Sequence, residues 1–485
     1  MNGSRSNSSS VAPLRADTLF LILIGIFAAI AGGLTAMVWG AIPLVLFSLP
    51  IAAAVVLANY QNGVWLLVLL LPFAATQLVP REMFGITGLN FENCLLVLTF
   101  SSLCLASLLS REAVRFPRLP LALLVYVALI ALAVYWGSGS VERAVTLHGQ
   151  EPLTVRTYLL DSFVKPMIIV IVAWLAAVVS RNGNGQPLIW ALAVAYAVFF
   201  VLIVGYLVVN GISLHSLASS NSDFSKPRNF LDWTGMHANE IGLQANLGFA
   251  ILLYTAAAAA RPLPRLTLFA CAAAAATTAA LTFSRGAFVG LAIILGYYLF
   301  SRRRTGQFVL ALSIIVGLVL ILPNAFVERA TTGFQTEDAH AITAGRFDTI
   351  WGPLLPTFWE APIFGHGLGS TPWATPNLRG AMLRAGHPHN AYLGVLLDMG
   401  MVGVAVVAAF FWSAWAMFRR LAKNHADHLW RGVFEGGVVC LMCLAAQGLT
   451  DDRFVPTYPQ VALWLCYGLA LGQAQSTCST KRTQP

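Results

Sequence analysis

The chain has 485 residues, of which 58% are hydrophobic and only 10% are charged, and its mean hydropathy is +0.74. A soluble domain usually carries about 25% charged residues. This composition therefore excludes a water-soluble globular enzyme, a disordered chain and a disulfide scaffold. The formal net charge of +9 does not call for nucleic acid as a partner, because membrane proteins keep an excess of Lys and Arg in cytoplasmic loops. The composition predicts an all-α, polytopic membrane protein.

One membrane-spanning helix takes about 20 apolar residues, and the apolar runs predict about 12–14 such helices. The polar residues 1–17 form an N-terminal tail, and the first apolar run is too long for the core of a cleaved signal peptide. Residues 18–323 are expected to hold helices with short loops, 324–388 a long loop, 389–474 the last helices and 475–485 a tail. The expected spans are 18–37, 40–58, 63–79, 91–109, 119–136, 163–180, 187–210, 238–260, 264–283, 286–301, 307–323, 389–417, 433–449 and 459–474.

Charged residues predict which side of the membrane each loop occupies. With the N-terminus in the cytoplasm, the cytoplasmic segments hold 17 of the 29 Lys and Arg residues and four of the 20 acidic residues. This asymmetry follows the positive-inside rule. We therefore expect both termini in the cytoplasm and the long loop outside.

Polar side chains that could carry chemistry are concentrated on the predicted outer face. Seven of the nine histidines lie there, and the longest loop, 324–388, lies there as well. Long loops in compact proteins are often functional. An extracytoplasmic site excludes direct use of ATP or nucleotide sugars, and no G-x-x-x-x-G-K-[ST] phosphate loop occurs in the chain.

The most informative segment is the end of the long loop and the helix that follows it. Pro388 separates a Gly/Pro-rich loop from what we expect to be an uninterrupted apolar helix. His389 and Asn390 then lie near a helix N-terminus, where free N–H groups and the positive dipole end favour an anion. Gly400 and Gly403 are expected to allow tight helix packing.

His389-Asn390, nine residues, Gly400, two residues and Gly403 resemble the H-[NSQ]-x9-G-x-x-G pattern of the bacterial O-antigen ligase and polymerase superfamily. The R…W…E-x-P-x-F-G-x-G-x-G stretch from Arg346 and the Ser284-Arg285-Gly286 element resemble the same family, and the likeness covers roughly residues 220–450. It implies a GT-C-like, metal-independent glycosyltransferase with a long periplasmic loop. Such enzymes move a glycan en bloc from undecaprenyl diphosphate to an acceptor hydroxyl.

Departure of a diphosphate develops negative charge, which arginine can neutralise bidentately. Arg285 is the catalytic candidate for this task because it interrupts two apolar runs, where a charge is costly and often functional. Its alternative role is to extend to the membrane surface. Arg228 and Arg346 are candidate substrate-binding residues, and an ordinary loop salt bridge is the alternative for Arg228.

Histidine titrates near working pH and can take the proton of an acceptor hydroxyl. His389 is the catalytic candidate for this role, with helix capping or loop packing as its alternative, and His387 is its competitor. Asn390 is expected to position His389 or to bind glycan, and His237 is a further candidate for substrate binding. The histidines lack metal-ligand spacing, so no metal and no cofactor is predicted.

The residues barely separate two reactions of this superfamily. A ligase transfers glycan to lipid A–core, whereas an O-antigen or exopolysaccharide polymerase transfers it to another lipid-linked repeat unit. The histidine motif and the long loop favour the ligase slightly. The resemblance implies an undecaprenyl-diphosphate-linked donor, membrane lipids, the bacterial inner membrane and, for a polymerase, a chain-length regulator. A polysaccharide or lipid transporter is a remote alternative, because it would place ionisable groups along a central pathway.

Overall fold

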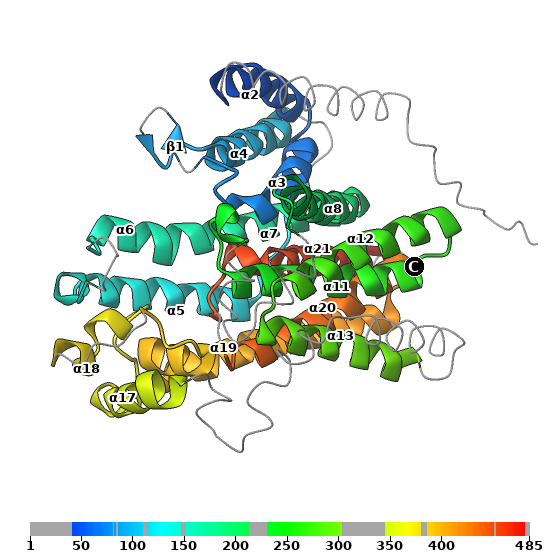
Figure 1. Cartoon of the computed structure of the whole chain (residues 1–485). Helices are drawn as coiled ribbons and strands as arrows, with labels where there is room; N and C mark the ends of the chain where they lie inside the picture. The colour runs from blue at the N-terminus through cyan, green and yellow to red at the C-terminus, as the bar shows by residue number, and fades with distance from the viewer. Residues whose placement is uncertain are drawn as a thin grey trace, which may run out of the picture.

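The computed structural model describes residues 41–80, 82–83, 86–109, 114–146, 152–212, 230–302, 345–379, 386–450 and 453–480. This part of the protein is a helical bundle with one two-stranded hairpin (Figure 1). Eight of the described helical stretches are long and apolar enough to cross a membrane. The all-α, polytopic membrane fold is thereby confirmed.

The strands are β1 (Glu82–Met83) and β2 (Ile86–Thr87), and α6 (Val155–Leu159) is a short helix. The long helices are α2 (Ala41–Ala58), α3 (Tyr60–Ala74), α4 (Phe91–Leu109), α5 (Leu121–Ser138), α7 (Lys165–Arg181), α8 (Gln186–Val209), α11 (Ala238–Ala258), α12 (Pro262–Leu281), α13 (Arg285–Arg302), α19 (Ala391–Asn424), α20 (His428–Gln447) and α21 (Val461–Thr480). Each expected span within the described residues overlaps one of these helices. The spans expected at 18–37 and 307–323 lie outside the described residues. A π-helical turn, Leu160–Val164, joins α6 to α7, so this helix begins earlier than residue 163.

Helix α11 lies at the centre of the bundle and packs against α12, α13 and α20. Within its span 89% of the residues are buried inside the protein. Small residues allow membrane helices to approach closely, and α20 uses glycine in this way. A Cβ at Gly432 would lie 2.4 Å from the Tyr254 carbonyl oxygen of α11, and one at Gly436 would lie 2.7 Å from the Cα of Ile251. The tight α11–α20 contact fixes the position of α20, whose C-terminal end contributes to the candidate site.

Helix α19 is broken at Gly400, which contradicts the expectation of an uninterrupted helix after Pro388. Gly400 has φ 63° and ψ −160°, a conformation that glycine adopts far more readily than other residues. The break also corrects the role expected for Gly400, which ends one helical segment and begins another. Gly403 lies one turn further on, and a Cβ there would lie 2.2 Å from the Met399 Cβ.

A loop, residues 361–369, fills the break and satisfies its backbone. The carbonyl oxygens of Leu397 and Asp398 accept hydrogen bonds from the N–H groups of His366 (2.8 Å) and Gly367 (3.0 Å). The N–H groups of Met401 and Val402 donate in turn to the carbonyls of the loop residues 362 and 363, at 2.9 and 3.1 Å. Non-helical backbone at membrane depth is tolerated where protein buries it and completes its hydrogen bonds. The loop therefore stabilises the break by supplying hydrogen-bond partners that lipid does not have.

Glycine is needed on both sides of this junction. A Cβ at Gly400 would lie 2.4 Å from the Ile363 carbonyl oxygen, and one at Gly365 would lie 2.4 Å from the Asp398 carbonyl carbon. We expect Gly400→Ala to destabilise the protein by at least about 2 kcal/mol, from left-handed backbone strain and overpacking. Thermal unfolding of the purified protein measures this loss. Gly205→Ala is the matched control, because that helical glycine has open space around its Cβ position. Equal unfolding temperatures for the two variants would contradict this account.

Short helical turns continue the described part of the long loop. They are η4 (Phe347–Trp351), α17 (Gly352–Leu354), η5 (Leu355–Glu360), η6 (Thr371–Trp373) and α18 (Thr375–Leu378). These turns gather beside the beginning of α19, at one end of the bundle (Figure 1). We call this end, where α11, α13 and α19 begin and α20 ends, the site end.

Candidate functional site

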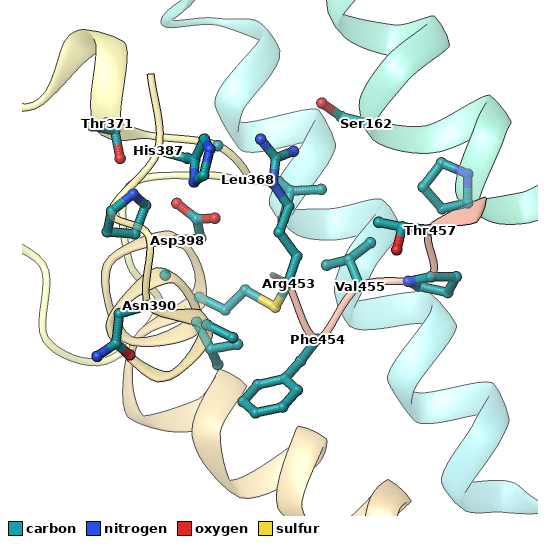
Figure 2. A pocket seen from close by; sticks show the side chains of 18 of the residues that line it. Ser162, Leu368, Thr371, His387, Asn390, Asp398, Arg453, Phe454, Val455 and Thr457 are labelled. Atoms are coloured by element: carbon teal, nitrogen blue, oxygen red, sulfur yellow. The ribbon is translucent and has the colours of Figure 1, made fainter. Parts of the chain in front are cut away.

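A pocket opens at the site end beside the first turns of α19 (Figure 2). Its wall is formed by residues from the beginning of α19, from 368–371 in the long loop, from 453–457 between α20 and α21, and from the π-helical turn before α7. The empty space is ≈ 660 Å³, part of it open to solvent. Segments far apart in the sequence therefore meet around one cavity.

The histidine motif lies on the rim of this pocket. His387 and Asn390 line it, and the His389 ring lies against the His387 ring with centroids 3.9 Å apart. His389 has φ 50°, an uncommon conformation for a residue other than glycine, and one that clusters at functional sites. The N–H of His389 donates to Nδ1 of His387 at 3.3 Å. The two histidines thus form one unit, with His387 on the pocket side.

Asn390 is the N-cap of α19. Its Oδ1 accepts hydrogen bonds from the N–H groups of Tyr392 (3.0 Å) and Leu393 (3.1 Å), which satisfies two of the free donors at the helix start. The structure therefore gives Asn390 a capping role, and its place in the pocket wall keeps it a candidate for binding glycan.

Three charged residues of the pocket, Asp161, Asp398 and Arg453, were not among the sequence candidates for a binding role, and Asp161 is paired with Lys165. Asp398 lies in the wall, and its Oδ1 accepts hydrogen bonds from the N–H (2.9 Å) and the Oγ–H (2.8 Å) of Ser370. Arg453 is exposed and reaches the same pocket from the segment after α20 (Figure 2). Asp398 lies inside the expected span 389–417, and the sequence alone does not assign a role to a carboxylate there. Arg453 carried only one signal, its place in an outer loop between two spans.

Arg346 and the Ser284-Arg285-Gly286 element both meet the segment that follows α20. The Arg346 guanidinium donates to the Thr450 carbonyl. A Cβ at Gly286 would be 3.6 Å from the Thr450 Oγ1, so the residue after Arg285 lies beside the same threonine. The beginning of α19 joins them, because the Ala391 N–H donates to the Gly448 carbonyl at 2.7 Å. The end of α20 is thus the place where the two arginine elements and the histidine motif converge.

His237 is the N-cap of α11, the helix that packs against α20. Its Nδ1 accepts from the Asn239 N–H at 3.3 Å, and its own N–H donates to Glu240 Oε2 at 3.0 Å. Asn239 ties this cap to the arginine element, since its Oδ1 accepts the Ser284 hydroxyl hydrogen bond at 2.8 Å. The structure therefore shows a capping role for His237 at the edge of the convergence. Arg228, the remaining candidate, lies outside the described residues.

Trp351 fixes the long loop against the histidine motif, and the two candidate arginines are partly shielded from water. Trp351 donates its indole N–H to the Pro388 carbonyl at 2.8 Å, which ties the long loop to the histidine motif. Arg285 and Arg346 are half-buried, so each charge is partly shielded from water, where its interaction with an anion is strengthened. Among the described residues, no group of three or more His, Cys, Asp and Glu side chains could hold a metal ion.

The bundle and its site define a polytopic membrane protein with polar groups gathered at one end. The family model described as O-antigen ligase matches residues 270–408. The match supports the O-antigen ligase superfamily and confirms the resemblance seen in the motifs. The matched residues include Arg285, Arg346, His387, His389, Asn390 and Asp398. No curated protein matches the chain.

Proposed function

We propose that the protein transfers a glycan from undecaprenyl diphosphate to an acceptor hydroxyl at the site end of the bundle. The O-antigen ligase match supports a membrane glycosyltransferase. The observation that carries the proposal is the convergence at the end of α20, where the arginine elements and the histidine motif meet around Gly448 and Thr450. We propose that the site end faces the periplasm, in the bacterial inner membrane, with both termini cytoplasmic.

The reaction joins the acceptor oxygen to the anomeric carbon of the donor sugar. The bond from that carbon to the phosphate oxygen breaks, and the diphosphate leaves with the bonding electrons. Arg285 and Arg346 would neutralise the charge that develops on the diphosphate. The acceptor proton would pass to the imidazole of His389, with His387 beside it as the alternative base. Arg228 would assist in holding the diphosphate, and Asn390 and His237 in positioning the substrates.

The acceptor decides between the two forms of this reaction. With lipid A–core as acceptor the protein is a ligase, and with a second lipid-linked repeat unit it is a polymerase of O-antigen or exopolysaccharide that would work with a chain-length regulator. We favour the ligase slightly, because of the histidine motif and the long loop. Neither form as proposed uses a metal ion, a cofactor or nucleic acid.

A cell-surface glycan profile of a deletion strain tests the proposal. A ligase defect leaves complete long chains on undecaprenyl diphosphate and none on lipid A. A polymerase defect leaves single repeat units on lipid A, or removes a secreted polymer. A deletion strain with a normal profile would contradict both forms.

Transport is the remaining alternative, and Arg346→Ala separates it from transfer. We expect this variant to transfer glycan at least about 100-fold more slowly, because it removes the positive charge that would stabilise the leaving diphosphate. Movement of the lipid-linked precursor across the membrane should stay intact. Transfer in membrane vesicles and access of the precursor to an external probe measure the two steps. Loss of precursor movement would contradict transfer and favour a transporter.

A further inference from the structure

The pocket beside α19 holds two opposite charges that do not pair directly. Asp398 and Arg453 both line it, yet the ion pairs in the described part of the chain are Lys165–Asp161 and Arg302–Glu435. Figure 2 shows both side chains at the same cavity, with the His387 ring near them. Because both groups line the same cavity, a polar ligand in it could reach the carboxylate and the guanidinium together.

Asp398 is held in place before any ligand arrives. Both hydrogen bonds from Ser370 go to Oδ1, and Ser370 is buried with 2% of its surface exposed. A carboxylate offers about four lone-pair sites, so two hydrogen bonds leave it able to accept more. The backbone of Asp398 is fixed as well, because its carbonyl accepts from Gly367 at 3.0 Å. Such a fixed acceptor is suited to binding hydroxyl groups.

The remaining wall suits the C–H surface of a sugar ring. Met399, Phe454 and Val455 contribute apolar surface, and Asn390 and Thr371 contribute polar atoms at the same cavity. An apolar wall with a few fixed polar groups is the usual composition of a small-molecule site. The Asp398 carboxylate repels an anion and the Arg453 guanidinium attracts one, so the two opposite charges together favour an uncharged ligand that carries both donors and acceptors. The diphosphate is better accommodated on the side of Arg285 and Arg346.

We propose that this pocket is a subsite for an uncharged sugar unit, in which Asp398 accepts and Arg453 donates hydrogen bonds to the sugar hydroxyls. This inference rests on the proposed function, because it assigns to that same site a place for the glycan apart from the diphosphate. The sugar could belong to the donor or to the acceptor glycan, since both present the same hydroxyl chemistry.

Saturation-transfer NMR on the full-length protein in nanodiscs tests the subsite. The neutral probes are the methyl glycosides of glucose, galactose, N-acetylglucosamine and rhamnose, and the anionic probe is glucuronic acid. We expect at least one neutral glycoside to bind and to outcompete glucuronic acid in the wild type. Asp398→Asn should weaken the neutral probe about tenfold, as expected for a lost hydrogen bond to a charged group. The same variant should also show a smaller preference than the wild type for the neutral probe over glucuronic acid.

Two further variants keep the test decisive. Arg453→Gln changes an exposed residue and should weaken the neutral probe in the same range even if Asp398→Asn fails to fold. Glu360→Gln is the matched control, since Glu360 bonds Thr375 at 2.6 Å in the long loop and does not line the pocket. No binding by any neutral glycoside would overturn the inference. Equal binding by wild type, Asp398→Asn and Arg453→Gln would overturn it as well.

Two added lipids separate the sources of the sugar. Undecaprenyl diphosphate without sugar should leave the probe bound. For a ligase, lipid-linked glycan extracted from the deletion strain should displace the probe if the pocket holds the donor sugar and leave it bound if the pocket holds the acceptor sugar, and both results support the subsite. For a polymerase, whose acceptor is also lipid-linked, the glycan should displace the probe in either case, and a probe that stays bound would overturn the subsite. Because these measurements need no turnover, they can fail while glycan transfer still depends on Arg285, or succeed while the cell-surface profile contradicts transfer.

Discussion

Replacement of Arg285 by alanine is expected to lower glycan transfer by at least about 100-fold, the usual cost of removing one charge-stabilising donor. Arg285 is the first residue of α13 and is half-buried beside the end of α20. A charge held there costs stability in the membrane, and stabilisation of a leaving diphosphate offers a reason to keep it. Initial rates of transfer in membrane vesicles, at matched protein levels, measure the effect.

Two substitutions sharpen this experiment. Arg285→Lys keeps the charge but loses the bidentate geometry of the guanidinium, so we expect an intermediate rate. Arg261→Ala removes an exposed arginine before α12, at the end of the bundle opposite to the site end, because α11 begins at the site end and ends shortly before Arg261, and it should leave transfer unchanged. A full rate for Arg285→Ala would remove this residue from the reaction.

The second large effect is expected at the histidine pair. Loss of a general base typically costs about 10²–10⁴-fold in rate, and we expect this loss for His389→Asn. Asparagine is the informative replacement because it tolerates the positive φ of His389, so the backbone at the start of α19 is kept. Single-turnover transfer rates, with donor and acceptor saturating, measure the chemical step.

His387→Asn and His428→Asn complete the series. His387 lines the pocket, so its loss should weaken substrate binding more than the chemical step if His389 is the base. His428 is exposed at the beginning of α20, at the opposite end from the site, and serves as the control. A larger loss of the chemical step in His387→Asn than in His389→Asn would assign the base to His387 instead.

Hydropathy was sufficient to predict the helices, because a membrane span needs a long apolar run whatever its neighbours are. The break in α19 was not predictable in the same way. Gly400 stands in a run that is apolar enough to span the membrane, and glycine is frequent in membrane helices. Its positive φ depends on hydrogen bonds from residues 362–367, which are about 35 positions earlier in the chain. Pairing at such a separation leaves no mark on local periodicity.

In the candidate site too, the sequence predicts some residues, whereas their contacts depend on packing between distant segments. Arg285, Arg346 and His389 stand out in the sequence because they fall in recognisable motifs at helix ends or in the long loop. The sequence spacing does not predict that they converge on the end of α20. The carbonyls of Gly448 and Thr450 accept the hydrogen bonds from α19 and from Arg346, and any residue type offers a backbone carbonyl. Arg453 was missed for a related reason. Its relevance comes from sharing a pocket with Asp398, which is a fact of packing between distant segments.

The junction between residues 361–369 and α19 also sets the unit in which this protein can be recombined. Four backbone hydrogen bonds tie residues 362, 363, 366 and 367 to residues 397, 398, 401 and 402 in a fixed register. An insertion or deletion on one side would shift every partner, whatever side chains it carried. A chimaera that exchanges the long loop between two such enzymes must therefore take the loop and the first half of α19 together, with a crossover after Val402.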